Sequence, residues 1–230
     1  MISKKSICTI ISLTALLFLC ACSVSTPTAV NPTPNPITPT AQGGLTILAF
    51  GDSLTAGFGV EEDDNYPSIL EEKLRMDGYD VRVINGGISG ETSTSALARL
   101  DWMLQTEPDI VIVETGANDA LRGVELDLTH KNIDEIVSRF TASDAIVVVA
   151  GLQIIQNLGT EYTNEFAEIY PSVAENHNAI LIPFVLEGVA TDPELNQPDF
   201  IHPNAKGYAV MVDHIYEYIL KAIELAGNRK

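Results

Sequence analysis

Five short apolar segments, each followed by a polar turn, constrain the fold of this chain more than any other feature of its sequence. They span residues 45–50, 81–85, 109–115, 145–151 and 179–184. Stretches with helical spacing of apolar residues lie between and after them, at 66–78, 94–105, 132–140, 161–177 and about 204–226. Strands that alternate with helices predict a parallel sheet with helices on both faces. We therefore expect an α/β fold with a five-stranded parallel sheet.

The polar motifs of the sequence directly follow the predicted strands. Residues 51–54 follow the first strand, 85–91 include the turn after the second, and 116–119 follow the third. In open parallel sheets, binding sites lie at the carboxyl ends of the strands. The sequence therefore predicts a functional site at this edge of the sheet.

The balance of charge excludes some classes of function. The chain has 31 acidic and 13 basic side chains among its 230 residues, for a formal net charge of −18. Nucleic-acid binding requires lysine and arginine against phosphate, so we expect no nucleic-acid partner. The same charge argues against electrostatic docking on anionic lipid. With 46% hydrophobic residues, the chain has enough apolar side chains for a packed core.

The first 22 residues have the pattern of an export signal. Lys4 and Lys5 supply the positive start, and an apolar run at residues 7–19 follows. This run is too short to span a bilayer comfortably as a helix. We therefore expect residues 1–22 to direct the chain out of the cytoplasm.

The end of this segment, Leu19-Cys20-Ala21-Cys22, resembles the lipobox of bacterial lipoproteins. Cys22 fits that motif better than Cys20, because the residue before Cys22 is small. The resemblance implies lipidation of Cys22 and a protein of the bacterial cell envelope that is anchored to a membrane, since several acyl chains on one cysteine anchor stably. The alternative is an ordinary secretory signal, cut near the same point, and a secreted protein.

A linker follows the signal segment. Residues 23–44 are rich in Ser, Thr, Pro and Asn and have almost nothing to bury, which is typical of an extended, proline-stiffened tether. All three cysteines lie in the first 22 residues, so the body of the chain has neither a disulfide framework nor a thiolate metal site. We expect one folded domain at residues 45–230.

Ser53 is the first candidate for catalysis. It follows the first predicted strand, where a strand-to-helix turn can present a hydroxyl group above the sheet edge. The backbone N–H of Ser53 would lie at a helix N-terminus, where partial positive charge gathers. Alternatively, Ser53 is a helix cap without a chemical role.

His202 is the candidate general base. A serine nucleophile needs a nearby base, and that base needs a carboxylate on its other ring nitrogen. Asp199 precedes His202 by three residues and can supply the carboxylate from a single turn. Pro203 biases His202 away from the helical region and so holds it in the loop before the last helix. The alternative is an exposed histidine in a surface loop.

Two further residues offer hydrogen-bond donors for a developing oxyanion. Gly90 follows the second predicted strand, and its N–H can approach a substrate closely because no side chain blocks it. Asn118 follows the third strand and can offer its side-chain amide. With the N–H of Ser53 these make three donors, each worth about 10²–10³ in rate. Alternatively, Gly90 serves turn geometry alone and Asn118 caps the next helix.

The sequence resembles the SGNH, or GDSL, hydrolase family in four blocks. They are GDSL at 51–54, GGISGET at 86–92, GAND at 116–119 and DxxH at 199–202. The longer stretches ISGETSTSALARL, VIVETGANDALRG and IHPN are similar to its thioesterase I, lysophospholipase L1 and arylesterase branch. The resemblance covers the whole predicted domain. It implies a three-layer α/β/α sandwich, flavodoxin-like, that needs no metal and no cofactor.

The resemblance also implies a role for each candidate residue. Ser53 is the implied nucleophile, and Asp199 and His202 complete the triad. The N–H groups of Ser53 and Gly90 and the amide of Asn118 are the implied oxyanion donors. The implied enzyme is a serine esterase that hydrolyses aryl and acyl esters, lysophospholipids or thioesters through an acyl-serine intermediate. Its partners are then small ester or lipid substrates, and we expect a monomer.

The sequence leaves more than one alternative for the substrate and for the activity. Leu121, Ile154 and Ile155 either form an apolar wall for an acyl chain or belong to ordinary core. The same triad would serve a polysaccharide O-acetylesterase, and a tethered binding protein without activity is a further alternative. Export places the protein where acyl-CoA is scarce, which argues against a physiological thioesterase role.

Overall fold

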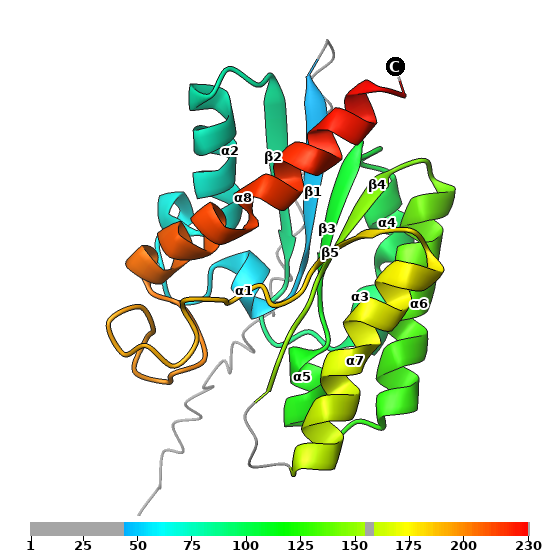
Figure 1. The fold of residues 1–230 in the computed structure, drawn as a ribbon, viewed down its shortest axis with the longest axis vertical. Helices are drawn as coiled ribbons and strands as arrows, with labels where there is room; N and C mark the ends of the chain where they lie inside the picture. Colours follow the sequence, from blue (N-terminus) through cyan, green and yellow to red (C-terminus); the bar gives the residue numbers. More distant parts are fainter. Residues whose placement is uncertain (1–43, 155–158, 230) are drawn as a thin grey trace, which may run out of the picture. The chain divides into compact units, whose positions relative to one another are not determined.

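Five parallel strands form one sheet in the part of the chain that this computed structural model describes, residues 44–154 and 159–229. They are β1 (Leu45–Gly51), β2 (Val81–Gly87), β3 (Ile110–Glu114), β4 (Ile146–Ala150) and β5 (Ile180–Ile182). The strand order is β2-β1-β3-β4-β5, which is the flavodoxin-like order (Figure 1). The predicted α/β fold class is therefore confirmed.

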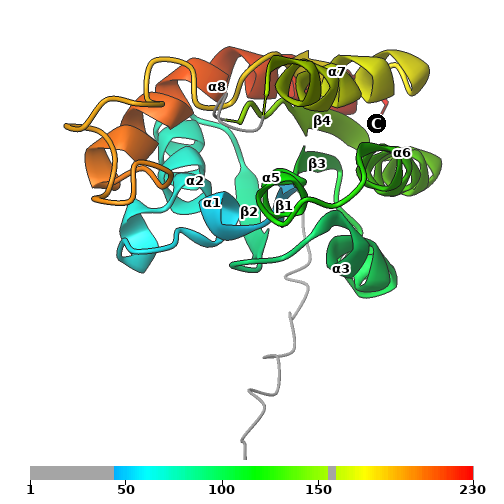
Figure 2. The ribbon, with the colours of Figure 1, turned by 90° about the horizontal axis from the view of Figure 1, so that it is seen from below.

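Helices cover both faces of this sheet. They are α1 (Ser53–Ala56), α2 (Tyr66–Met76), α3 (Ser93–Ala98), α4 (Leu100–Leu104), α5 (Ala117–Leu121), α6 (Leu126–Ala142), α7 (Thr160–Asn176) and α8 (Ala205–Gly227), with a short 3₁₀ helix η1 at Glu62–Asp64. Figure 2 shows α8 on one side of the strands and α3 on the other. Helix α2 packs beside α8, and α6 packs beside α3. The result is three layers, helix, sheet and helix.

The central strands form the core and align their carboxyl ends. Every residue of β3 and β4 is buried, as is the second part of β1 from Ile47 to Gly51. Burial of each large apolar side chain contributes roughly 1.5–3 kcal/mol to stability relative to leaving it exposed to water. This contribution stabilises the packed sheet. In the sheet register, Gly51 lies opposite both Gly87 and Glu114. The segments after β1, β2 and β3 therefore start from a common edge.

Several elements differ from the sequence predictions, and α6 begins six residues before the predicted start at residue 132. Residues 94–105 form two helices, because the backbone leaves the helical region at Arg99, where ψ is 2°. Strand β5 ends at Ile182 because Pro183 has no N–H with which to continue the ladder. The short helix α5 is not predicted at all, since five residues are too few for a periodic pattern.

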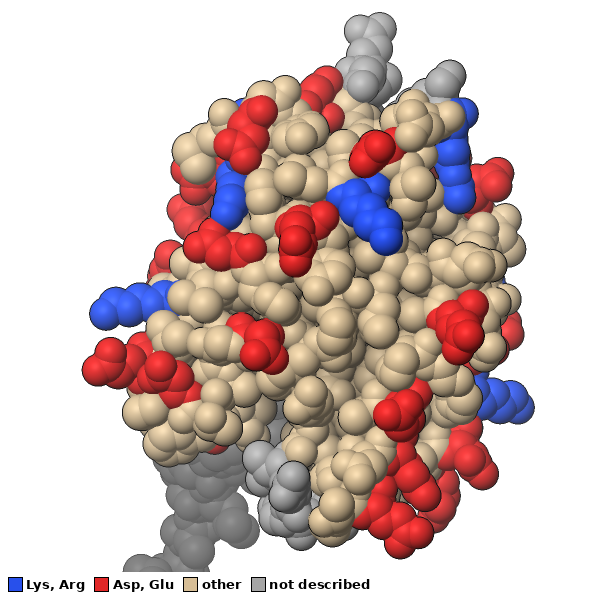
Figure 3. All heavy atoms as spheres, viewed as in Figure 1, with Lys and Arg blue, Asp and Glu red and all other residues tan. Residues whose placement is uncertain are grey.

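Several predictions concern residues outside the described part. The signal segment 1–22 with Cys22, residues 23–43 of the linker, and Ile155 all lie there. Among the helices that the structure does describe, none combines the length and the apolar character needed to cross a membrane. On the face seen in Figure 3, acidic side chains outnumber basic ones, as expected from the net charge.

Candidate active site

Ser53 lies directly after β1, at the carboxyl edge of the sheet. It is the first residue of α1, so its backbone N–H has no partner within that helix. Asp52 is the N-cap of α1, and its Oδ1 accepts a hydrogen bond from the N–H of Leu54 at 3.2 Å. The interpretation of Ser53 as a helix cap is therefore wrong. A Cβ atom at Gly51 would lie 2.4 Å from the backbone carbonyl oxygen of Glu114, so the end of β1 requires glycine.

His202 reaches Ser53 from a loop that is distant in sequence. Its Nε2 lies 2.8 Å from Oγ of Ser53, and its Nδ1 lies 2.7 Å from Oδ2 of Asp199. The second carboxylate oxygen of Asp199 accepts hydrogen bonds from the N–H groups of Ile201 and His202, at 2.9 and 3.0 Å. One aspartate therefore both closes the turn and holds the imidazole.

Gln197 ties the loop of His202 to the segment that follows α1. Its side-chain amide donates to the carbonyl oxygens of Phe58 at 2.6 Å and Pro203 at 3.0 Å. Its backbone N–H donates to the carbonyl of His202 at 2.8 Å. The ring of Phe58 packs against the imidazole with 4.8 Å between ring centroids. These contacts hold the imidazole over the hydroxyl of Ser53.

The charge of Asp199 sets the proton arrangement on the imidazole. Burial opposes ionisation of this carboxyl group, but hydrogen bonds from His202 and Ile201 outweigh burial and lower the pKa of Asp199 to about 2. An ionised carboxylate can only accept, so Nδ1 of His202 carries a proton and Nε2 presents its lone pair to Ser53. In this state the imidazole can take the hydroxyl proton.

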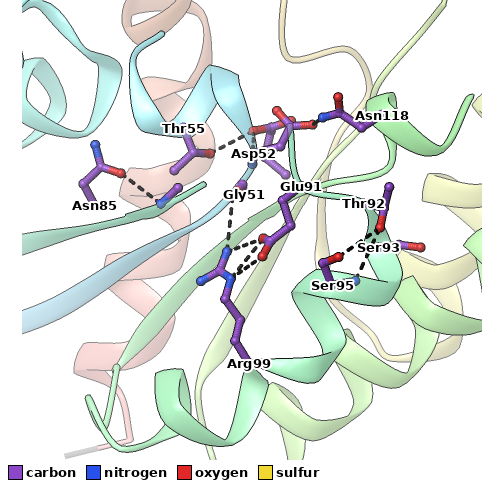
Figure 4. Close-up of polar contacts among 12 residues, drawn as sticks. Gly51, Asp52, Thr55, Asn85, Glu91, Thr92, Ser93, Ser95, Arg99 and Asn118 are labelled. Atoms are coloured by element: carbon purple, nitrogen blue, oxygen red, sulfur yellow. Dashed lines mark hydrogen bonds and ion pairs between the residues drawn. The ribbon is translucent and has the colours of Figure 1, made fainter. Parts of the chain in front are cut away.

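Gly90 and Asn118 border the same cavity as Ser53. Gly90 has a φ of +78°, in the left-handed region that favours glycine. The Nδ2 atom of Asn118 donates to Oδ2 of Asp52 at 3.0 Å (Figure 4). An amide nitrogen has two N–H groups, so one remains available for a ligand. Gly116 is the N-cap of α5, so the interpretation of Asn118 as a helix cap is wrong.

A second carboxyl group, Glu114, is fully buried behind Asp52. Its Oε2 accepts hydrogen bonds from Oγ1 of Thr55 at 2.8 Å and from the N–H of Asp52 at 3.3 Å. Its Oε1 has no hydrogen-bond partner within the described residues. Burial, and then the negative charge of Asp52, raise the pKa of Glu114 well above its ordinary value. Burial raises the pKa of Asp52 as well, but hydrogen bonds from the N–H of Leu54 and the amide of Asn118 oppose that rise. Because the pKa of Glu114 is raised further above its ordinary value, we expect Glu114 to hold a proton more readily than Asp52.

Asp119 joins the loops that carry Gly90 and Asn118. Its buried carboxylate accepts from the backbone N–H of Ser93 at 2.7 Å and from the Ser93 hydroxyl at 2.5 Å. Oγ1 of Thr129 donates to the same carboxylate at 3.3 Å. These bonds fix the start of α3 against α5 and so limit the movement of the two loops.

The site opens into an apolar cavity of about 290 Å³. Apolar side chains that line it include Leu121, Leu152, Ile154, Phe184, Leu186 and Ala190. Of the three residues proposed for an acyl wall, Leu121 and Ile154 line this cavity. Leu121 is 54% exposed, so it does not belong to the core, whereas Ile154 is partly buried against the core. Ile155 lies outside the described residues.

Other candidate sites in the described part are weaker. A larger but open depression beside α2 is lined mostly by polar and acidic side chains, and it contains none of the residues proposed for catalysis. No three His, Cys, Asp or Glu side chains in the described segments are grouped so that they could hold a metal ion.

Glu114 and the side chain of Asp52 have no role among the sequence predictions. A signal for Glu114 was present, since it is a single carboxyl group at the end of an otherwise apolar strand. Such a residue is rarely buried without a partner. The contact with Asp52 had no signal, because it joins residues 62 positions apart in the chain.

Comparisons with known proteins identify the family of the chain. The model of the GDSL-like lipase/acylhydrolase family matches residues 49–210, which is more than half of the chain. The chain belongs to this family. This GDSL-family protein is 37% identical to an arylesterase from Vibrio mimicus over 182 residues, which cover 79% of this chain and 91% of that protein. It is 35% identical to the thioesterase 1/protease 1/lysophospholipase L1 of Escherichia coli K12, covering 73% and 80% of the two chains.

This GDSL-family chain is also similar in fold to solved structures of esterases. The crystal structure of TesA covers 77% of this chain and 99% of that chain, with a TM-score of 0.75 and 33% identity. The psychrotrophic esterase EstA from Pseudoalteromonas sp., solved in a form inhibited by monoethylphosphonate, covers 78% and 98% with a TM-score of 0.74 and 35% identity. The protein is therefore an enzyme, a GDSL-type serine hydrolase.

Proposed function

We propose that this enzyme hydrolyses carboxylic esters, with Ser53 as nucleophile and His202 as general base. One observation carries the proposal: Ser53, His202 and Asp199 form a continuous chain of contacts, 2.8 and 2.7 Å long, at an apolar cavity. The names of the related arylesterase and esterases support the same reaction class.

The acylation step follows from the positions of these atoms. Oγ of Ser53 attacks the ester carbonyl carbon while Nε2 of His202 takes its proton. Asp199 stabilises the imidazolium through Nδ1. His202 then protonates the oxygen of the leaving alcohol, the carbon–oxygen bond breaks, and an acyl-serine remains. Water attacks the acyl-serine with His202 again as base, and the acid is released with Ser53 restored.

Three hydrogen-bond donors are expected to stabilise the negatively charged oxygen of the tetrahedral intermediate. They are the backbone N–H groups of Ser53 and Gly90 and the free N–H of the Asn118 amide. The bond from Asn118 to Asp52 orients that amide before substrate binds. Donors that are already in place lower the barrier because they need not reorganise during the reaction.

The apolar cavity favours substrates with an acyl chain longer than acetyl. Its aliphatic and aromatic walls stabilise a chain by about 0.8 kcal/mol for each buried methylene group. This lining supports aryl and acyl esters or lysophospholipids, and it does not favour the alternative of a polysaccharide O-acetylesterase. Membership of a hydrolase family likewise does not favour a binding protein without activity.

A series of p-nitrophenyl esters from acetate to palmitate tests this proposal with the full-length protein. We expect Ser53→Ala and His202→Ala to lower kcat/KM by at least about 10³-fold. Asp199→Asn is expected to lower it by roughly 10²–10⁴-fold, because the imidazole loses the partner that fixes its tautomer. We expect kcat/KM to peak at a chain longer than acetyl.

His177 provides a matched control for this experiment. Its Nε2 lies 2.8 Å from Oδ1 of Asp134, so it is a histidine–aspartate pair that does not contact Ser53. His177→Ala is expected to keep the activity of the parent. Hydrolysis that persists in Ser53→Ala would contradict the assigned nucleophile. An optimum at acetate would instead support an acetylesterase.

We further propose that the enzyme lies outside the cytoplasm, anchored to a membrane of the cell envelope by a lipid on Cys22. Lys4, Lys5, the apolar run at 7–19 and the small Ala21 support this proposal. Metabolic labelling with an alkynyl fatty acid is expected to label the parent and Cys20→Ser, but not Cys22→Ser. Label retained in Cys22→Ser would refute the anchor, and protein found only in the medium would support secretion.

A further inference from the structure

A buried ion pair connects the loop that carries Gly90 to the end of β1, two residues before Ser53. Glu91, the neighbour of Gly90, accepts from Arg99 at both carboxylate oxygens: Nε lies 2.7 Å from Oε1, and Nη2 lies 2.6 Å from Oε2. Nη2 also donates to the carbonyl oxygen of Gly51 at 3.3 Å. Figure 4 shows the guanidinium group directed toward both Glu91 and Gly51, with dashed lines to each. One side chain therefore contacts both segments.

Two backbone hydrogen bonds add to this connection between Gly51 and the loop that carries Gly90. The carbonyl oxygen of Gly51 also accepts from the N–H of Ile88 at 3.0 Å, and the carbonyl of Ile88 accepts from the N–H of Glu91 at 3.1 Å. Gly90 lies inside the turn that the second bond closes. Ile88 at one end and the ion pair of Glu91 at the other therefore hold this turn against Gly51, while the exposed Arg122 donates to the carbonyl oxygen of Gly90 at 2.6 Å.

The ion pair is shielded from water. The side chain of Glu91 is 4% exposed and that of Arg99 is 14% exposed. The guanidinium also lies over the ring of Phe50, 4.2 Å from its centroid. Buried ion pairs add little to stability relative to apolar residues of similar size, since desolvation offsets their attraction. Stability alone therefore does not account for a charged pair at this place.

We propose that Arg99 and Glu91 are positioning residues for the oxyanion site. They fix the N–H of Gly90 relative to the N–H of Ser53, two residues after Gly51. The inference rests on the proposed function, because it requires both N–H groups to bind the charged oxygen. A displacement of about 1 Å in such a site can lower the rate about 10²-fold. A small shift of the Gly90 N–H after loss of the ion pair is therefore expected to lower the rate measurably.

The double variant Glu91→Met/Arg99→Met of the full-length protein tests the proposal. It removes both charges together, so neither is left buried without a partner. After active-site titration, we expect kcat per active site to fall roughly 10–100-fold with KM within about 3-fold of the parent. A trifluoromethyl ketone, whose serine adduct carries an oxyanion, is expected to bind correspondingly more weakly. The matching alcohol, which lacks that charge, is expected to bind as before.

Glu71→Met/Arg75→Met is the matched control. Arg75 contacts Glu71 at 2.7 Å and donates to the carbonyl of Val81 at 3.1 Å, at the opposite end of β2. This arginine thus bridges a glutamate and a strand carbonyl, as Arg99 does, but away from Ser53. We expect the control to keep kcat per active site and its affinity for the ketone.

Two single variants of Arg99 test the same positioning role if the double variant does not fold. Arg99→Lys keeps the charge but loses the two-pronged contact, and we expect kcat to fall about 10-fold. For Arg99→Ala, methylguanidinium is expected to restore part of kcat, whereas sodium chloride at equal concentration is not.

Two outcomes would overturn these ideas, and they are distinguishable. Unchanged kcat and ketone affinity in the double variant, or in Arg99→Lys, would overturn the positioning role while the parent stays active. A parent without hydrolysis that depends on Ser53 would overturn the proposed function and this inference together.

Discussion

Asp199 and Glu114, two carboxyl groups of the site, differ in charge because their surroundings differ. Asp199 accepts three hydrogen bonds, from two N–H groups and an imidazole, and its pKa falls to about 2. Glu114 is fully buried, and its pKa is raised well above its ordinary value by burial and then by the charge of Asp52. One group therefore supplies the charge that the imidazole needs, and the other stays neutral beside Asp52.

Glu114→Gln is expected to become more stable relative to the parent as pH rises. In the parent, the folded state keeps the proton of Glu114, while the unfolded state releases it near pH 4.3. The parent therefore loses stability as pH rises above about 4.3, by up to about 1.4 kcal/mol per pH unit until Glu114 ionises in the folded state. Glutamine carries no such proton, so this loss is absent from the variant.

Urea denaturation of both proteins between pH 4 and 8 measures this difference. A constant offset is expected in addition, because the glutamine amide replaces an oxygen that has no partner. If the difference in the free energy of unfolding does not change with pH, Glu114 ionises equally in both states and its assignment as a neutral acid is wrong.

At the scale of elements, helix α1 is placed by its contact with the end of β2. A Cβ atom at Gly87 would lie 2.2 Å from the backbone nitrogen of Ala56 and 2.6 Å from the carbonyl carbon of Thr55. Both are backbone atoms of α1, so rotation of a side chain cannot relieve the collision. Because Ser53 begins α1, the separation of this strand and helix also sets the position of the proposed nucleophile.

Gly87→Ala is expected to lower both stability and activity. Overpacking of this kind costs about 1–3 kcal/mol, and the displaced α1 would move Ser53 away from His202. We expect kcat per active site to fall at least 10-fold, a loss that active-site titration separates from loss of folded protein.

Gly227→Ala is the control for that variant. Gly227 ends α8, and apart from its chain neighbours and the backbone of its own helix no atom of the described residues lies within 4 Å of the added Cβ position. Its activity should equal that of the parent. Full activity in Gly87→Ala would show that α1 and β2 can separate without effect on the site.

At the scale of the whole molecule, the net charge of −18 affects which substrates associate quickly. Acidic side chains outnumber basic ones on the face in Figure 3. A polyanionic substrate such as an acyl-CoA is repelled over distances that ionic strength controls, whereas a neutral ester is not.

For decanoyl-CoA, kcat/KM is expected to rise about 3–10-fold between 0.01 and 0.15 M salt, as the screening length falls from roughly 30 to 8 Å. For p-nitrophenyl decanoate it should stay constant. The ratio of kcat/KM for decanoyl-CoA to kcat/KM for p-nitrophenyl decanoate, taken at each ionic strength, serves as the internal control. A decrease for decanoyl-CoA would indicate a local basic site that outweighs the net charge.

The sequence by itself was enough to predict the fold class and to propose the residues of the site. Strand and helix periodicity are local properties, so the alternation of elements is visible without any knowledge of packing. Asp199 and His202 are equally local, because three residues separate them and a single turn joins them. The motif of Ser53 is visible for the same reason, although its partner His202 is 149 residues away.

The tertiary structure alone decided how these residues meet. The pairing of Asp52 with Asn118, the burial of Glu114, and the contact of Arg99 with both Glu91 and Gly51 join separate elements at the sheet edge. Such contacts depend on strand order, register and the closeness of packed backbones, none of which has a periodic signal in the chain. The sequence therefore determined which chemical groups this protein carries, and packing decided their distances and their charges.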